Sequence, residues 1–210
     1  MKRLTVDELN LEAQPGAIAG TLMNSSADLV TRVCHGDSEA FRLIFERYSR
    51  PVISFIYDMV NDRPLAEELT QETFVRAFRA IRTMHRDTKL STWLFGIARN
   101  VARESLRARA RAANHVDLAD KSVMDLSDQK PMPVEGLLSK ELNELIRRSL
   151  AALDEDKRMV FTLKVLHQCS YEEISIITGF SLAKLKTDLH RARAEMRKRI
   201  SSYAGVGYEV

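Results

Sequence analysis

The 210-residue chain has few cysteines, glycines and prolines, and each shortage excludes a class of protein. Its two cysteines, Cys34 and Cys169, cannot build a disulfide framework, which favours the reducing cytoplasm. Eight glycines and five prolines exclude collagen-like and low-complexity chains. No apolar run approaches the roughly 18 residues of a membrane-spanning helix, and the first residues lack the apolar segment of a signal peptide. We therefore expect a cytoplasmic protein that does not insert into a membrane.

The chain also lacks the common catalytic and metal-binding motifs. It has no P-loop, no G-x-S-x-G and no H-E-x-x-H. Cys34-His35 and His167-x-Cys169 could supply four zinc ligands, but the two pairs lie in different expected domains and lack the usual C-x-x-C spacing. We expect no enzyme activity, no cofactor and no metal site.

Helical periodicity is what the sequence has in abundance. Apolar residues recur at helical spacing within 40–106 and again within 138–166, whereas the strict alternation of strands is rare. The segment between them is basic, then polar, and carries two prolines, which is typical of a linker. We predict an all-α fold of two small helical domains, an N-terminal helical bundle and a C-terminal helix-turn-helix domain, joined by a flexible linker. The predicted boundaries are a mobile extension over 1–26, the bundle over 27–106, the linker over 107–136, the helix-turn-helix domain over 137–203 and a tail over 204–210.

The most specific local signal begins at Ser170. Residues 170–173 (SYEE) have the form of a capping box, which predicts the start of a helix. Gly179 stands where that helix ends, because glycine tolerates the left-handed backbone of a helix C-terminus. Ser181 can then cap a second helix that runs to about Arg199. A short helix, a turn with glycine and a second helix indicate a helix-turn-helix.

The second helix of this motif has the charge of a DNA-recognition helix. Residues 181–200 contain seven Lys and Arg against two acidic residues, a net charge of +5. A basic helix can be no more than a solvated face, but the capping box and the turn glycine beside it favour DNA binding. Asp188 is the discordant residue, because phosphates repel a carboxylate unless it is paired or accepts a hydrogen bond from cytosine.

Charge is also unevenly distributed in the N-terminal half. Residues 28–72 hold five basic and nine acidic side chains, whereas residues 76–111 hold ten basic and two acidic ones. The first segment therefore favours a basic partner and the second an anionic one. Aromatic and amide side chains in the basic segment suit single-stranded DNA, and the polar loop over 85–89 could hold an everted base. For Trp93 we favour packing in the core, since it lies on the apolar stripe of its helix.

Three segments, taken in order, resemble the extracytoplasmic-function (ECF) group of bacterial RNA polymerase sigma factors. Residues 66–74 (AEELTQETF) are similar to the family segment D-A-E-D-L-x-Q-E-x-F. Residues 90–100 (LSTWLFGIARN) are similar to F-x-T-W-L-x-x-I-A-x-N. Residues 170–174 (SYEEI) and 186–193 (KTDLHRAR) are similar to S-Y-x-E-I-A and V-K-S-R-L-H-R-A-R. The resemblance covers roughly residues 28–106 and 137–200.

The resemblance implies a function in transcription initiation through binding rather than bond-making. It implies docking on the β′ clamp helices and the β flap of core RNA polymerase, and the clamp-docking residues carried over by position are Glu68, Leu69, Gln71 and Glu72. It implies that the −10 promoter element is read, with one base flipped, by Arg86, Lys89, Thr92, Arg99, Asn100 and Arg103. It implies that the −35 element is read as duplex DNA by Lys184, Lys186, Thr187, His190, Arg191 and Arg193. Control by an anti-sigma factor and a place in the bacterial cytoplasm are further implications.

The sequence departs from the family pattern at a few positions, and two other functions stay open. Asp188 stands where a basic residue is usual, which leaves the −35 preference undetermined, and the N-terminal extension has no counterpart. One alternative is a sigma-like decoy that sequesters an anti-sigma factor without touching promoters; the intact basic helix argues against it. The other is a helix-turn-helix repressor or activator, which has no need of the segment over 66–74.

Overall fold

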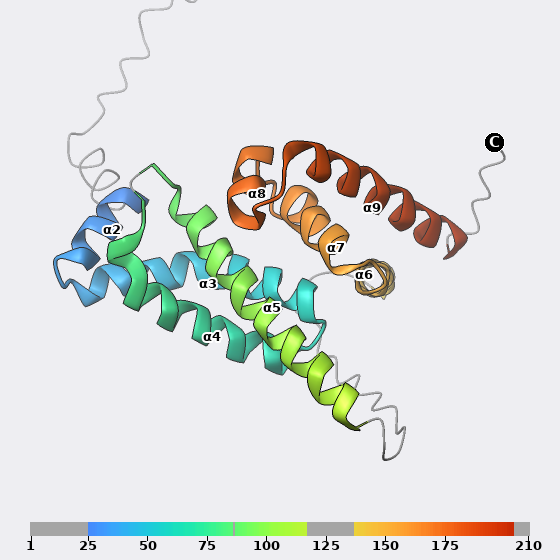
Figure 1. Ribbon diagram of the computed structural model, residues 1–210, viewed down its shortest axis with the longest axis horizontal. Helices are drawn as coiled ribbons and strands as arrows, with labels where there is room; N and C mark the ends of the chain where they lie inside the picture. Colours follow the sequence, from blue (N-terminus) through green and yellow to red (C-terminus); the bar gives the residue numbers. More distant parts are fainter. Residues whose placement is uncertain (1–24, 86, 117–136, 204–210) are drawn as a thin grey trace, which may run out of the picture. The chain divides into compact units, whose positions relative to one another are not determined.

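The computed structural model describes residues 25–85, 87–116 and 137–203, and all of the regular structure in these ranges is helical (Figure 1). The all-α prediction is confirmed. Most of the predicted extension, much of the predicted linker, the tail and Arg86 lie outside the described residues. Within the described part of the chain, every helix is too short or too polar to cross a bilayer. Packing divides the chain inside one long helix, into a unit that ends at Arg47 and a unit that begins at Tyr48.

The first unit contains α2 (Ser26–Cys34) and the start of α3 (Ser38–Val60). Ser25 caps α2, because its side chain accepts a hydrogen bond at 3.1 Å from the backbone N–H of Asp28. The chain then turns at Gly36, whose φ of +93° lies in the left-handed region that favours glycine. Among the described residues of this unit, the buried apolar side chains are Leu29, Val33, Ala40 and Ile44.

The second unit starts within α3 and continues through α4 (Arg63–Ala80), the short helix η2 (Ile81–Thr83) and α5 (Leu90–Val116). Asp62 caps α4 by accepting a hydrogen bond at 3.0 Å from the N–H of Leu65. α4 and α5 run side by side (Figure 1). The rings of Phe55 and Phe95 meet edge to face at 5.4 Å, which joins α3 to α5. The main buried side chains of these helices are Val52, Phe55, Ile56, Met59, Leu69, Phe74, Leu94, Phe95, Ala98 and Val101.

α5 is longer than the sequence analysis predicted. The linker was expected from residue 107, yet the helix continues to Val116. Residues 107–112 alternate arginine and alanine and are all exposed. Both residue types are strong helix formers, so this segment is helical without an apolar stripe to bury. The first part of the predicted linker, residues 107–116, is therefore a helical extension of α5.

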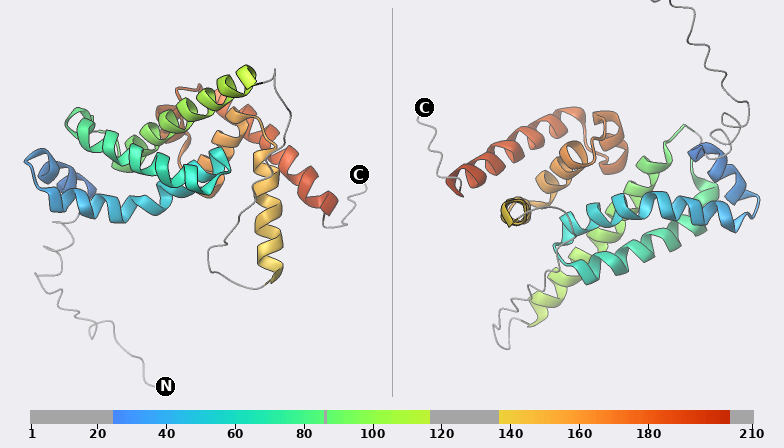
Figure 2. Two further views of the ribbon diagram at one scale, coloured as in Figure 1. Left: turned by 90° about the horizontal axis from the view of Figure 1, so that it is seen from below. Right: turned by 180° about the vertical axis from the view of Figure 1, so that it is seen from behind.

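The C-terminal helices are α6 (Leu137–Ala151), α7 (Glu155–Phe161), the π-helical turn η3 (Thr162–Leu166), α8 (Tyr171–Thr178) and α9 (Leu182–Tyr203). α7 and α6 both pack against α9, and Figure 2 shows α7 and α9 together from two further sides. The side chains buried among these helices include Leu150, Leu153, Met159, Val160, Leu163, Ile174, Ile177, Leu185, Leu189, Ala192 and Met196. The helical periodicity predicted for this half is confirmed.

Candidate nucleic-acid interface

The connection between α8 and α9 has the geometry of a helix-turn-helix. In the capping box, Ser170 Oγ accepts a hydrogen bond from the N–H of Glu173 at 3.1 Å, and the Glu173 carboxylate accepts one from the N–H of Ser170 at 2.7 Å. α8 ends at Gly179, which is left-handed with a φ of +73°. Ser181 Oγ then accepts a hydrogen bond from the N–H of Lys184 at 3.3 Å at the start of α9. The three local signals read from the sequence are confirmed.

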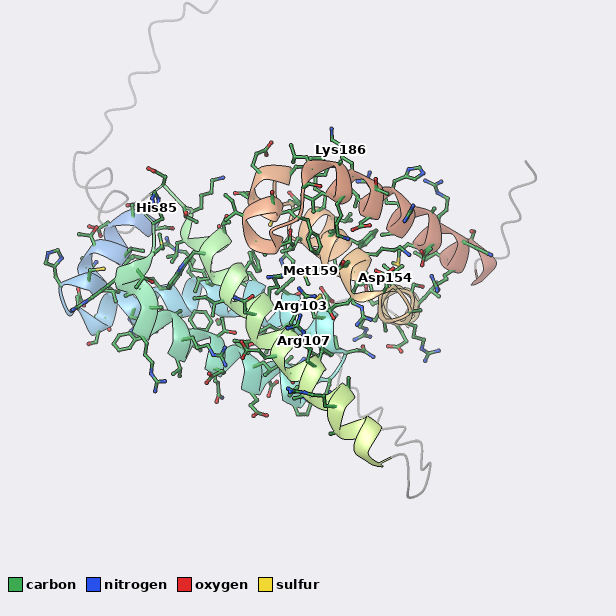
Figure 3. All side chains as sticks on the ribbon, in the orientation of Figure 1. His85, Arg103, Arg107, Asp154, Met159 and Lys186 are labelled. Atoms are coloured by element: carbon green, nitrogen blue, oxygen red, sulfur yellow. The ribbon has the colours of Figure 1, made fainter. Side chains whose placement is uncertain are left out.

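One face of α9 carries most of the side chains predicted to contact the −35 element. The exposed ones are Lys186, Thr187, His190, Arg191 and Arg193. Figure 3 shows Lys186 pointing away from α7. The Thr187 hydroxyl donates a hydrogen bond to the carbonyl of Ala183 at 2.9 Å, which leaves its oxygen as an acceptor. Guanidinium and ammonium groups on such a face suit guanine edges and phosphates.

Lys184, also predicted as a −35 contact, lies in a different environment. Its Nζ is 2.6 Å from Asp188 and 3.0 Å from Asp156 of α7, and it lies 4.4 Å from the centroid of the Phe180 ring. The hydrogen bonds to Asp188 and Asp156 raise the pKa of Lys184. Asp188 is only 8% exposed, so this carboxylate faces the domain interior and is paired there. That resolves the discordance noted in the sequence.

Among the described residues predicted to read the −10 element, Lys89 directly precedes α5, and Thr92, Arg99, Asn100 and Arg103 lie in its first half. Asn100 is exposed, and its Oδ1 accepts a hydrogen bond at 3.2 Å from the guanidinium of Arg99. Arg99 is half-buried, and this burial lowers its pKa. Thr92 is 3% exposed and lies beneath the surface. Arg86 lies outside the described residues, so only part of the predicted set is placed.

Two of the predicted −10 residues form ion pairs with acidic residues of the C-terminal helices. Lys89 Nζ lies 2.8 Å from a carboxylate oxygen of Glu173, the acidic member of the capping box. The Lys89 side chain is 75% exposed, so water screens this pair. Arg103 lies 2.5 Å from Glu155 at the start of α7. Figure 3 labels Arg103, with Arg107 one turn further along α5.

Two of the four predicted clamp-docking residues present their side chains on the surface of α4. Glu68 and Gln71 are exposed. Glu72 is half-buried and lies 2.7 Å from Arg76 in an ion pair. Leu69 is buried and packs in the core. Leu69 thus anchors α4 in the core instead of contacting solvent.

Sequence reasoning missed the apolar part of the same face. Val75 and Phe78 are 42% and 53% exposed, and they follow Gln71 at helical spacing. A large apolar residue in a helical stripe is usually counted with the core, so the periodicity alone did not reveal their exposure. The exposed face of α4, defined here as Glu68, Gln71, Val75 and Phe78, is therefore acidic and polar at one end and apolar at the other.

His167, one of the four zinc ligands considered from the sequence, packs between aromatic rings. The His167 ring lies 5.0 Å from the ring of Phe95 and 6.0 Å from that of Phe55. Burial lowers the pKa of His167 to about 4. Among the described residues, no group of three or more His, Cys, Asp and Glu side chains could hold a metal ion. His167 is thus a neutral imidazole between aromatic rings.

Comparison with protein families and curated proteins gives two family matches and a set of relatives in sequence. The model of Sigma-70 region 2 matches residues 44–112, and that of Sigma-70, region 4 matches residues 143–196. The ECF RNA polymerase sigma-E factor of Escherichia coli (strain K12) is 32% identical over 179 residues, which are 82% of this chain and 92% of that protein. The RNA polymerase sigma-H factor of Pseudomonas aeruginosa is 29% identical over 181 residues, with the same two shares.

Solved structures share the fold. CnrH, in complex with the cytosolic domain of CnrY, matches with a TM-score of 0.64 and 19% identity, over 84% of this chain and 97% of that one. The sigma factor RpoE from Bartonella quintana, in complex with the anti-sigma factor NepR, matches with a TM-score of 0.64 and 21% identity, over 77% and 96%. At these identities the matches establish the arrangement of helices.

Proposed function

The chain belongs to the ECF group of RNA polymerase sigma factors and acts in transcription initiation, and from this premise we propose which of its surfaces bind polymerase and promoter. The exposed face of α4 docks on core polymerase, α5 and the loop before it read the −10 element, and α9 reads the −35 element. The observation that carries the proposal is the basic, exposed face of α9 behind a capped α8 and a left-handed Gly179.

At the −35 element, the N-terminal half of α9 enters the major groove, as recognition helices of this motif do. Lys186 and Arg191 are placed to donate hydrogen bonds to guanine O6 and N7. Thr187 offers an acceptor oxygen, and His190 lies on the same exposed face. Arg193, further along the helix, neutralises phosphate and fixes the register without reading sequence.

At the −10 element, Asn100 and Arg99 read bases, and the loop over 84–89 before α5 holds a flipped base of the melted strand. Lys89 and Arg103 exchange their carboxylate partners for phosphates on binding. An exposed ion pair contributes about 0.2–1 kcal/mol, so Lys89 leaves Glu173 at little cost. Flipping a base costs a few kcal/mol of unstacking, and contacts of the loop with the flipped base offset this cost and favour melted DNA.

The docking surface for polymerase is the exposed face of α4. Glu68 and Gln71 bring charge and hydrogen bonding to the contact with the clamp helices of the β′ subunit, and Val75 and Phe78 extend it with apolar area. Leu69 packs beneath this surface, and the ion pair with Arg76 fixes the position of Glu72. Apolar area beside polar and charged groups is typical of the surfaces of specific protein complexes.

The proposed partners are core RNA polymerase, through the β′ clamp helices and the β flap, promoter DNA, and an anti-sigma factor in the bacterial cytoplasm. The anti-sigma proposal is supported by RpoE, which has the same fold and was solved in complex with the anti-sigma factor NepR.

Run-off transcription tests the proposal directly. Core polymerase, alone and supplemented with the full chain, is offered a library of promoter fragments from the source genome. We expect the supplemented enzyme to start transcription at a discrete set of sites that share two sequence elements. Initiation no more specific than that of core polymerase alone would refute the proposed function.

A further inference from the structure

A compact ion cluster lies at the start of α9, beside the face proposed to read the −35 element. We name it the Lys184 clasp, and its members are Lys184, Asp188, Asp156 and Phe180. Lys184 and Asp188 stand one turn apart on α9, Asp156 belongs to α7, and Phe180 belongs to the turn after α8. The clasp therefore joins the first turns of the recognition helix to two other parts of the domain.

The clasp uses two of the three N–H donors of Lys184. An ammonium group has three N–H donors and no acceptor. Two directions lead to the carboxylates of Asp188 at 2.6 Å and Asp156 at 3.0 Å, and the Phe180 ring lies 4.4 Å from the nitrogen on another side. Such contact with the face of a ring further stabilises the cation. A phosphate that took over either of these two donors would displace a carboxylate.

The charge of the clasp also opposes recruitment. Two carboxylates and one ammonium group sum to −1, so the clasp adds no positive charge to the DNA-facing surface. Asp188 is 8% exposed, and removing its partner would leave a carboxylate shielded from water, which is strongly unfavourable. Lys184, whose side chain is 39% exposed, is therefore held within its own domain by two carboxylates and an aromatic ring.

We propose that Asp188 is a positioning residue for −35 recognition. Together with Asp156 it holds Lys184 away from DNA and fixes the first turns of α9 against α7, so that the reading face begins at Lys186. The inference rests on the proposed DNA-binding function of α9. The acidic Asp188, at a position where the family usually has a basic residue, thus helps to decide which side chains of α9 set promoter preference.

A second ion cluster between the same two helices provides a matched control. Lys157 of α7 lies 2.7 Å from Glu195 of α9, and Arg199 lies 3.4 Å from the same glutamate. Glu195→Gln weakens the link between α7 and α9 without touching Lys184. Any effect that arises merely from loosening α9 on α7 will therefore appear in Glu195→Gln as well.

The test measures the salt dependence of promoter binding by holoenzyme reconstituted from core polymerase and the full chain. The slope of log K against log salt changes by about 0.9 for each phosphate that the protein additionally neutralises or ceases to neutralise. In the double variant Asp156→Asn, Asp188→Asn, Lys184 is released, and we expect the slope to steepen by about 0.9. Adding Lys184→Ala should restore the wild-type slope, and Glu195→Gln should leave it unchanged.

A second comparison does not depend on the folding of the double variant. Lys184→Ala alone should leave the slope at its wild-type value. Arg193→Ala, on the exposed face, should make the slope less steep by about 0.9. Circular dichroism reports whether each variant is folded.

The outcomes separate the two proposals. A wild-type holoenzyme that binds no promoter specifically refutes the function proposed for α9. If the wild type binds specifically, the clasp proposal is overturned when the slope of a folded double variant is unchanged or when Glu195→Gln changes it equally. A slope in Lys184→Ala that is less steep than in the wild type also overturns it.

Discussion

The same substitution at two glycines should change stability in opposite directions. Gly179 ends α8 with a φ of +73°, whereas Gly96 lies inside α5. A Cβ added at either position meets no atom within 4 Å. Space is therefore equal at the two sites, and the backbone conformation alone distinguishes Gly179→Ala from Gly96→Ala.

The magnitudes follow from the backbone preference of alanine. A left-handed conformation costs an L-residue roughly 1–2 kcal/mol, and the lower entropy of the unfolded chain returns about 0.4–1 kcal/mol. Gly179→Ala should therefore destabilise the protein by about 1 kcal/mol. In a helix interior, alanine is more stable than glycine by roughly 0.5–1 kcal/mol, so Gly96→Ala should stabilise by that amount.

Thermal unfolding of the full chain, followed by the helical circular dichroism signal, measures both effects. For a chain of this size, about 1 kcal/mol shifts the midpoint by about 2–4 °C. The two variants should therefore lie on opposite sides of the wild type. Gly179→Asn should fall between Gly179→Ala and the wild type, because asparagine tolerates the left-handed region better. Equal shifts in one direction would contradict the backbone argument and with it the turn geometry of the motif.

Three further outcomes test the docking surface, the recognition helix and the buried ionisable groups. Glu68→Lys with Gln71→Ala should abolish co-purification with core polymerase while the helical content stays unchanged; undiminished binding removes this face from the docking surface. Arg191→Ala should weaken transcription that depends on the −35 element, and unaltered promoter selectivity would exclude Arg191 from base reading. Burial raises the pKa of Asp58 to about 7, so its contribution to stability is full below pH about 4 and is lost as the pH rises through about 7. The depressed pKa of His167 acts oppositely, because stability is full above pH about 6.5 and falls as the pH drops toward about 4. Asp58→Asn removes the group that opposes His167, so the unfolding free energy should rise more steeply with pH between about pH 4.5 and 6.5, by up to about 1 kcal/mol per pH unit. Urea titration at several pH values measures this slope. A slope identical to that of the wild type would show that Asp58 keeps no proton in the fold.

The parts of the fold that local chemistry dictates were predictable from the sequence. The capping box at Ser170, the left-handed Gly179 and the cap at Ser181 each act within a few residues, and all three lie where the sequence indicated. The end of α5 was not predictable from periodicity. Residues 107–112 are held by the helix propensity of arginine and alanine and by the ion pair of Arg109 with Asp62, and they are all exposed, so they form no buried stripe that a pattern search could find.

The candidate site was predictable in residue type but not in side-chain partner. Lys184 and Asp188 were expected on one helix, and their spacing of four residues is itself a signal for an ion pair. The pairing with Asp156 depends on which face of α9 meets α7, and that is decided by tertiary packing. Thr92 and Leu69 illustrate the same limit, because a family motif contains core residues as well as contact residues.

Because α5 is a single unbroken helix, it sets the distance between Asn100 and the basic residues near its end. A helix rises about 1.5 Å per residue, so Arg111 lies roughly 16 Å beyond Asn100 along one stiff axis. Phosphates of one DNA strand follow each other every 3.4 Å or so, and the interval along the helix corresponds to about five base steps. Beside a duplex strand that runs parallel to this axis, the basic end of α5 would therefore lie about five base steps from Asn100.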